Sequence, residues 1–290
     1  MIPFKLSVIS DEVSQDLEVV AKFANHYGLD GIEIRTVWNK PPQQLVGDLS
    51  QIKTILRDYG LEVPCIASPF YKANIDNISE IKEHLSILEK CILLATSLES
   101  NIIRVFTFWR KDTFWNFMDR ILELYKEPIK MAEENDVFLA VENEPSTFAT
   151  NAKKVSALLK KVNNPRLKAI WDPGNDLSDP DGENPYPEGY NYIKEYIIHV
   201  HLKDGIRKDL GKYEPTAIGK GEVDYLNQFK ALLRDGYKGY LSLETHWRPE
   251  KKLSEEQLVT PGGSSFSERG KEASAICMEN LLQILRSLLI

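Results

Sequence analysis

Cysteine is scarce in this 290-residue chain, which has only Cys65, Cys91 and Cys277. An odd number of widely separated cysteines does not make a disulfide framework, and it excludes a metal site built from clustered cysteines. We therefore expect three free thiols in a reducing compartment, and hence a cytoplasmic protein.

Two other features are missing, a long apolar segment and an excess of positive charge. No stretch approaches the roughly 20 apolar residues that a membrane span requires, and residues 1–10 lack the basic and apolar regions of a leader. The 36 Lys and Arg against 43 Asp and Glu give a net charge of −7, which disfavours binding to a phosphate backbone. We expect neither a membrane nor a nucleic acid as partner.

What the chain does have is a regular alternation of strand-like and helix-like segments, with no linker between them. Strands are predicted at 4–9, 31–35, 62–67, 101–108, 137–143, 167–171, 197–204 and 240–245. Helices are predicted at 17–27, 49–59, 78–97, 114–135, 152–162, 192–196, 225–235 and 272–289, with long loops at 176–190, 205–223 and 249–267. Such alternation predicts an α/β protein with parallel strands inside and helices outside.

Eight repeats fit a (β/α)8 TIM barrel that forms a single domain over residues 1–290. A doubly wound open sheet is the alternative. That fold usually has a Gly-rich turn after its first strand, and here the first strand is followed by Ser10-Asp11-Glu12.

The strand at 197–204 carries an unusual face. Side chains two apart share a face of a strand, so His199, His201 and Lys203 would point one way. A buried, unpaired charge costs roughly several kcal/mol. Either this strand is exposed in an antiparallel sheet, or a site inside the protein uses these groups.

A barrel places its active site at the carboxyl ends of its strands, where four successive predicted strands each end in a polar residue. The set is Glu142, Asp172, His201 and Glu244. Three converging carboxylates would repel one another and raise their pKa values, and a divalent cation would remove the repulsion. One imidazole with three carboxylates suits Mn²⁺, Mg²⁺, Co²⁺ or Zn²⁺. The alternative is that each carboxylate only caps a neighbouring loop.

The sequence resembles the sugar phosphate isomerase/epimerase family of xylose-isomerase-like barrels over nearly its whole length. The resemblance is carried by residues 31–35, 141–143, 171–175, 199–204, 219–224 and 243–246. It implies that Glu142, Asp172, His201 and Glu244 bind one divalent metal ion. It also implies that Glu142 and Glu244 are the catalytic acid/base pair.

The resemblance implies an isomerase or epimerase that acts on a keto sugar or related polyol. A metal on the carbonyl and a neighbouring hydroxyl stabilises the enediolate formed when the adjacent carbon loses its proton. Two carboxylates on opposite faces then invert that carbon, whereas one carboxylate serving neighbouring carbons gives isomerisation. No Gly-rich phosphate loop precedes a helix, which favours an unphosphorylated substrate.

Six further residues are candidates for substrate binding, each with a structural alternative. They are Lys203, Arg207, Asn175, Glu33, His199 and His246. Ion pairs, a solvated loop charge and a core histidine are the alternatives for Lys203, Arg207 and His199. Ketose 3-epimerases of the family carry His where Asn175 stands and an acidic residue where Phe148 stands, so their exact specificity is not expected here.

Three rival functions remain open. Related dehydratases of inositol-like ketones carry a similar His-Leu-Lys-Asp run, so a keto-inositol dehydratase assisted by Lys203 is one. The related apurinic-site endonuclease needs three zinc ions and more histidines than the five in this chain. The third is a non-catalytic sugar-binding barrel. A homodimer or homotetramer also remains open.

Overall fold

A computed structural model of the chain describes residues 4–288, and seven of its strands form one parallel sheet. The hydrogen-bonded order is β2-β1-β9-β6-β5-β4-β3. The strands are β1 (Lys5–Ile9), β2 (Gly31–Glu33), β3 (Ile102–Val105), β4 (Phe138–Glu142), β5 (Leu167–Trp171), β6 (Ile197–Leu202) and β9 (Tyr240–Leu243). Because β6 pairs in parallel with β5 and β9, the alternative of an exposed antiparallel strand is wrong.

Residues 62–67 close the gap between the two edge strands β2 and β3. The Glu62 carbonyl accepts the N–H of Ile32, while the N–H of Ile66 donates to the carbonyl of Ile102. The predicted strand here is reduced to isolated bridges, because Pro64 has no N–H to give to a ladder. The sheet and this segment together make the predicted TIM barrel.

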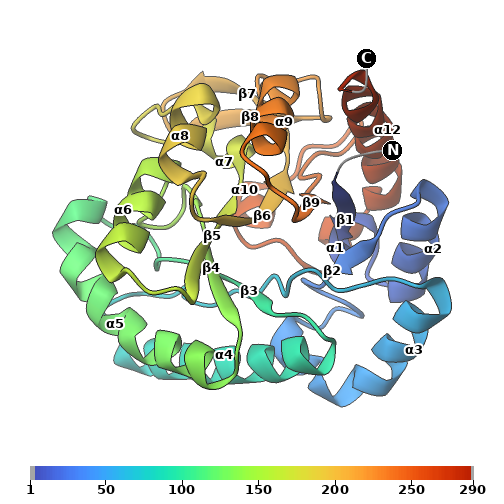
Figure 1. Ribbon diagram of the computed structural model, residues 1–290. Coiled ribbons are helices and arrows are strands. Elements are labelled where there is room, and N and C mark those ends of the chain that lie inside the picture. Colours follow the sequence, from blue (N-terminus) through green and yellow to red (C-terminus); the bar gives the residue numbers. More distant parts are fainter. Residues whose placement is uncertain (1–3, 289–290) are drawn as a thin grey trace.

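Helices surround the strands as an outer ring (Figure 1). The larger ones are α2 (Leu17–Tyr27), α3 (Leu49–Tyr59), α4 (Ile78–Ser97), α5 (Phe114–Glu134), α6 (Ala152–Val162), α9 (Tyr225–Arg234) and α12 (Gly270–Ser287). Short ones are α1 (Ser10–Val13), α7 (Pro173–Asp176), α8 (Tyr190–Ile193) and the turns η1 (Pro42–Gln44), η2 (Val46–Asp48) and η3 (Pro185–Gly189). As predicted, α2 ends at Gly28, whose φ of 65° favours glycine. None of the described helices is long and apolar enough to cross a membrane.

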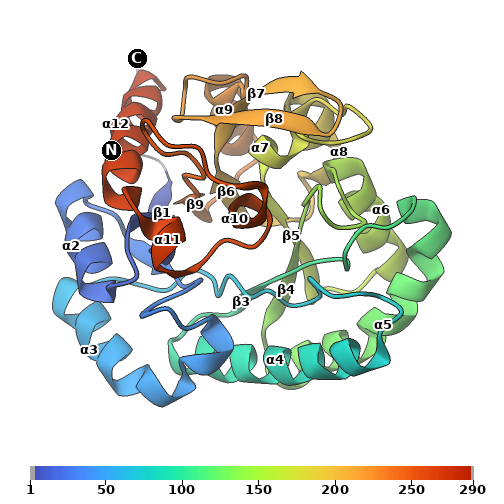
Figure 2. The same ribbon diagram turned by 180° about the vertical axis from the view of Figure 1, so that it is seen from behind.

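All three predicted loops contain regular structure, and residues 176–190 include the turn η3. Residues 205–223 include most of an antiparallel hairpin, β7 (Asp204–Asp209) and β8 (Lys212–Thr216). Residues 249–267 hold two short helices, α10 (Glu255–Val259) and α11 (Gly263–Ser267). Figure 2 shows the hairpin and α10 on the same side of the barrel. The predicted end of the last helix at Leu289, and residues 1–3 of the expected leaderless start, lie outside the described residues.

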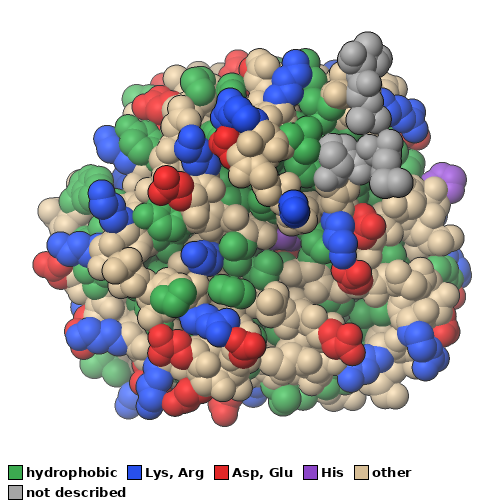
Figure 3. Space-filling view, in the orientation of Figure 1, with side chains coloured by type: hydrophobic (Ala, Val, Ile, Leu, Met, Phe, Trp, Pro, Cys, Tyr) green, Lys and Arg blue, Asp and Glu red, His purple; other side chains and the backbone are tan. Residues whose placement is uncertain are grey.

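The surface agrees with the charge balance of the sequence. On the face in Figure 3, basic and acidic side chains are interspersed, and no extended basic area forms on it. All three cysteines are buried and free, as expected.

The loop that follows α7 folds around a pair of buried acids. Asp176 is fully buried, and burial together with the nearby Glu183 raises its pKa well above the ordinary value. Burial likewise raises the pKa of Glu183, to about 7. The two carboxyl groups are therefore best accommodated when they share a proton.

Gly31→Ala tests the closure of the barrel. A Cβ at Gly31 would lie 2.6 Å from the carbonyl oxygen of Glu62, so β2 and residues 62–67 would have to separate. Overpacking of this kind costs about 1–3 kcal/mol, and we expect thermal unfolding monitored by circular dichroism to show a Tm lower by several degrees. Gly47→Ala is the control, because a Cβ there meets nothing within 4 Å. Equal Tm values for the two variants would contradict this account.

Glu183→Gln tests the buried acid pair. The pKa of Glu183 is raised from the ordinary 4.5 to about 7 in the folded chain. The protonated side chain therefore contributes fully to the free energy of unfolding below pH 4.5, and this contribution is lost as the pH rises to about 7. The Tm of the variant minus that of the wild type, measured by calorimetry from pH 5 to pH 8, should therefore increase as the pH rises. The exposed Glu188→Gln in the same loop should show no such trend. Parallel wild-type and Glu183→Gln profiles would refute the assignment.

Candidate metal centre

Four neighbouring strands bring together the four residues predicted as ligands. Glu142 ends β4, Asp172 follows β5, His201 lies in β6 and Glu244 follows β9. One nitrogen or oxygen from each lies within 4.8 Å of those of the others. All four residues are at most 1% exposed.

At three of these residues, one atom is held from outside the group and another faces the point where the four residues meet. The Oδ1 atom of Asp172 accepts the N–H groups of Gly174 at 2.9 Å and Asn175 at 3.2 Å, which makes Asp172 the N-cap of α7. The Oε1 atom of Glu244 accepts a hydrogen bond from Arg35 at 2.6 Å. The remaining oxygens face basic side chains: Asp172 Oδ2 and Glu244 Oε2 face Lys203, and Glu142 Oε2 faces Arg104. Buried carboxylates need positive charge nearby, and one metal cation could be shared by all three of these oxygens.

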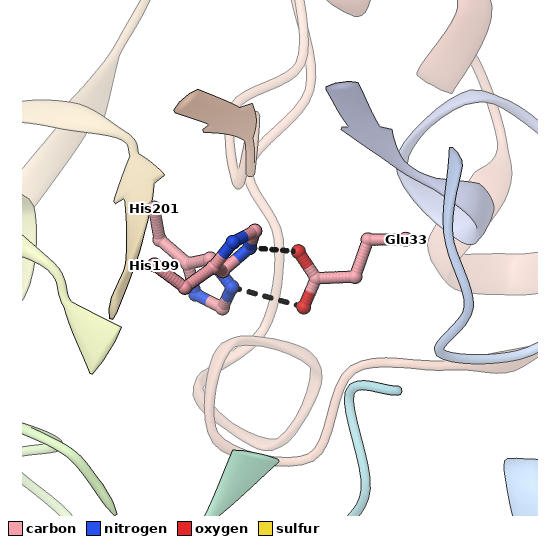
Figure 4. A group of neighbouring side chains, drawn as sticks. All are labelled: Glu33, His199 and His201. Atoms are coloured by element: carbon pink, nitrogen blue, oxygen red, sulfur yellow. Dashed lines mark hydrogen bonds and ion pairs between the residues drawn. The ribbon is translucent and has the colours of Figure 1, made fainter. Parts of the chain in front are cut away.

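At His201, the atom held from outside the group is Nε2, and the residue that holds it is Glu33 (Figure 4). His201 Nε2 lies 3.0 Å from Glu33 Oε1, and the other oxygen of Glu33 lies 2.8 Å from His199 Nε2. This leaves His201 Nδ1 directed at Glu142 Oε1, 3.1 Å away, and Glu244 Oε2, 3.5 Å away. A carboxylate that holds the second nitrogen of a histidine is typical of metal ligands.

The surrounding charges explain how so many ionisable groups are buried here. Burial opposes a charged His201, but the carboxylates of Glu33 and Glu142 outweigh it and hold the pKa of His201 well above its ordinary value. Burial would raise the pKa of Glu244, yet Lys203 and the nearby imidazoles hold it well below 4.5. For Asp172 burial prevails over Lys203, and its pKa is raised well above the ordinary value.

Basic side chains enclose the carboxylates. Lys203 Nζ lies 3.0 Å from Asp172 Oδ2 and 2.9 Å from Glu244 Oε2. Arg104 Nη1 lies 3.3 Å from Glu142 Oε2 and 3.8 Å from Glu244 Oε1. Glu33 faces His199 and His201 rather than an arginine.

The other predicted substrate-binding residues lie in different places. Asn175 donates to the carbonyl of Asn143 at 2.8 Å and lies 3.4 Å from Glu142 Oε1. His246 Nε2 is 3.4 Å from Glu244 Oε1, and burial together with the nearby Lys203 holds the pKa of His246 well below its ordinary value. Arg207 donates to the carbonyls of residues 176, 177, 182 and 183, so it ties β7 to the loop after α7.

Lys203, Asn175 and His246, which contact Glu244, Glu142 and Glu244 in turn, line a cavity of about 550 Å³. Tyr213 of β8 and Leu258 of α10 form part of its outer wall. The cavity therefore lies between the strand ends and the two elements that sequence reasoning had taken as loops.

Sequence reasoning missed a group of residues behind Glu244. Asp11 and Glu12 of α1 both accept hydrogen bonds from Arg35 at 2.8 Å. Arg248 lies 3.3 Å from Glu12. The signal was present, because Asp11 and Glu12 directly follow β1, where the carboxyl-end rule applies as it does to β4 and β5.

The comparisons with known proteins agree with this architecture. The model of the family described as xylose isomerase-like TIM barrel matches residues 21–260. An uncharacterized protein of Methanocaldococcus jannaschii, MJ1311, is 24% identical over 201 residues, which are 65% of this chain and 66% of that protein. Inosose dehydratase of Clostridium tetani is 25% identical over 137 residues, 42% of this chain and 45% of that enzyme.

Solved structures share the fold at low identity. The IOLI protein, solved with a zinc atom, is 16% identical with a TM-score of 0.74 over 98% of this chain and 99% of that one. The 3-keto-D-glucoside 4-epimerase YcjR from E. coli is 14% identical with a TM-score of 0.67, over 95% and 100% of the two chains. Because the family model spans most of the sequence, the chain belongs to the xylose isomerase-like TIM barrel family.

Proposed function

We propose that this protein is a divalent-metal-dependent isomerase or epimerase of a keto sugar or related polyol. The observation that carries the proposal is the convergence of Glu142, Asp172, His201 and Glu244 on one point, where the three carboxylates are balanced by the charges of Lys203 and Arg104. A family in which one solved structure holds zinc and another is an epimerase supports it.

The donor set fits one divalent ion. Asp172 Oδ2, Glu244 Oε2, His201 Nδ1 and an oxygen of Glu142 would hold it, and this mixture suits Mn²⁺, Mg²⁺, Co²⁺ or Zn²⁺. When bound, such an ion stabilises negative charge on substrate oxygens as the adjacent carbon is deprotonated. Glu33 would keep the Nε2 proton of His201 in place and so leave Nδ1 as the ligand.

The chain's own groups would then move the proton. Glu142 and Glu244 come from β4 and from the end of β9, which are separated in the sheet by β5 and β6. In our proposal one of these carboxylates takes the proton from the substrate carbon and the other returns it. Lys203, which lines the cavity, would donate to a substrate oxygen, while Asn175 and His246 would contact hydroxyl groups.

A second candidate is dehydration of a keto polyol, and the position of Lys203 favours it. Loss of water from the carbon next to the one deprotonated requires a proton for the departing hydroxyl group. Lys203 Nζ lies between Asp172 and Glu244 and borders the cavity, so it could supply that proton. The similarity to inosose dehydratase supports this reading.

The first test is exchange of solvent deuterium into a panel of keto sugars and keto-inositols, followed by NMR. We expect exchange that depends on added Mn²⁺ or Mg²⁺ and stops with a chelator. Glu142→Gln and Glu244→Gln should each lower the rate by about 10²–10⁴-fold, the usual contribution of a general acid or base. The exposed Glu188→Gln serves as control. Full exchange in either site variant would exclude the proposed roles.

A Lys203→Met variant separates the two candidate reactions. If the protein is a dehydratase, the variant should keep deuterium exchange but lose formation of the unsaturated ketone, followed by ultraviolet absorbance. If it is an epimerase or isomerase, the wild type forms no unsaturated ketone from any exchanging substrate. Loss of exchange and dehydration together in the folded variant would show that Lys203 acts before water is lost.

A further inference from the structure

We propose that Arg35 is a positioning residue: it binds one oxygen of Glu244 and so orients the other oxygen toward a metal cation. The inference rests on the proposed metal site and deepens it, because it names a residue outside the ligand set. Arg35 follows β2 and is 3% exposed.

The guanidinium of Arg35 uses all three of its nitrogens on three different carboxylates. Its Nη1 donates to Glu244 Oε1 at 2.6 Å, its Nε to Asp11 Oδ1 at 2.8 Å and its Nη2 to Glu12 Oε1 at 2.8 Å. The planar fork of a guanidinium fixes the angles between these bonds. One oxygen of Glu244 is thereby fixed in space, and Oε2 is turned toward Lys203 and His201, on the side of the proposed ion.

Arg35 is itself held from several sides. Its backbone N–H donates to Ser10 Oγ at 3.1 Å, and its guanidinium lies 5.1 Å from the centre of the Phe266 ring. Thr36 Oγ1 donates to the second oxygen of Asp11 at 2.8 Å. The side chain is therefore pre-organised before any cation arrives, which lowers the cost of ordering Glu244.

The same contacts argue against a second metal ion beside the first. Glu12, Glu244 and His246 also bring ligand atoms within 4.8 Å of one another. The guanidinium nitrogens already lie 2.6 and 2.8 Å from the oxygens of Glu244 and Glu12. Arg35 thus places a positive charge on that side, so only Glu244 Oε2, which faces Lys203 and the proposed ligands, can serve the proposed ion.

The effect should appear in metal affinity. Partners that orient a metal ligand typically change affinity by about 10–100-fold when they are removed. We expect Arg35→Ala to weaken Mn²⁺ binding by about that factor, measured by electron paramagnetic resonance of free Mn²⁺ and by calorimetry. Arg35→Lys keeps the charge but not the fork, and we expect it to weaken binding by a smaller factor.

Two comparisons separate positioning from general damage. Guanidinium chloride at millimolar concentration should restore Mn²⁺ affinity to Arg35→Ala, whereas ammonium chloride should not. Arg248→Ala removes a buried arginine that shares Phe266 and Glu12 with Arg35 but pairs with none of the four proposed ligands. Its Mn²⁺ affinity should stay within about threefold of the wild type.

Each outcome decides the inference. Wild-type affinity in folded Arg35→Ala overturns it and leaves the metal site intact. If Arg35→Ala does not fold, wild-type affinity in Arg35→Lys overturns it. A wild-type chain that binds no Mn²⁺, Mg²⁺, Co²⁺ or Zn²⁺ overturns the proposed function and the inference with it.

Discussion

The balance of buried charge at the mouth of the barrel is the constraint on which the rest of the structure depends. Six buried carboxylates form one contiguous network of ion pairs: Asp11, Glu12, Glu33, Glu142, Asp172 and Glu244. Four permanently charged side chains face them: Arg35, Arg104, Lys203 and Arg248. The excess of two negative charges would be balanced by one divalent cation. Without such an ion, a protonated His201 and a raised pKa of Asp172 relieve part of it.

The strand-end rule explains how much of the site could be predicted. Glu142, Asp172, His201 and Glu244 were found because the carboxyl ends of parallel strands meet at one edge, so local sequence fixes the position of each side chain. The hydrogen bond from Arg35 to Glu244 joins residues that are 209 positions apart in the sequence. No periodicity reveals which of several buried charges will pair across a barrel, and Glu33 was assigned to the substrate although it faces His199 and His201.

The fold was predicted for a similar reason, and its misses have physical causes. Helices such as α2 show their apolar stripe and glycine cap in the sequence itself. The β7–β8 hairpin was taken as a loop because it lies outside the barrel and its strands are polar. Helix α10 has a Ser254–Gln257 capping box that could have revealed it.

Helix α10, which forms part of the outer wall of the cavity, is less buried than the strand ends on the other side. No residue of α10 is buried, and the segment is tied to the barrel through contacts such as that between Lys72 Nζ and the Val259 carbonyl. A substitution in α10 therefore removes no fully buried side chain. Changes in α10 can therefore alter the outer wall of the cavity while the residues at the strand ends stay the same.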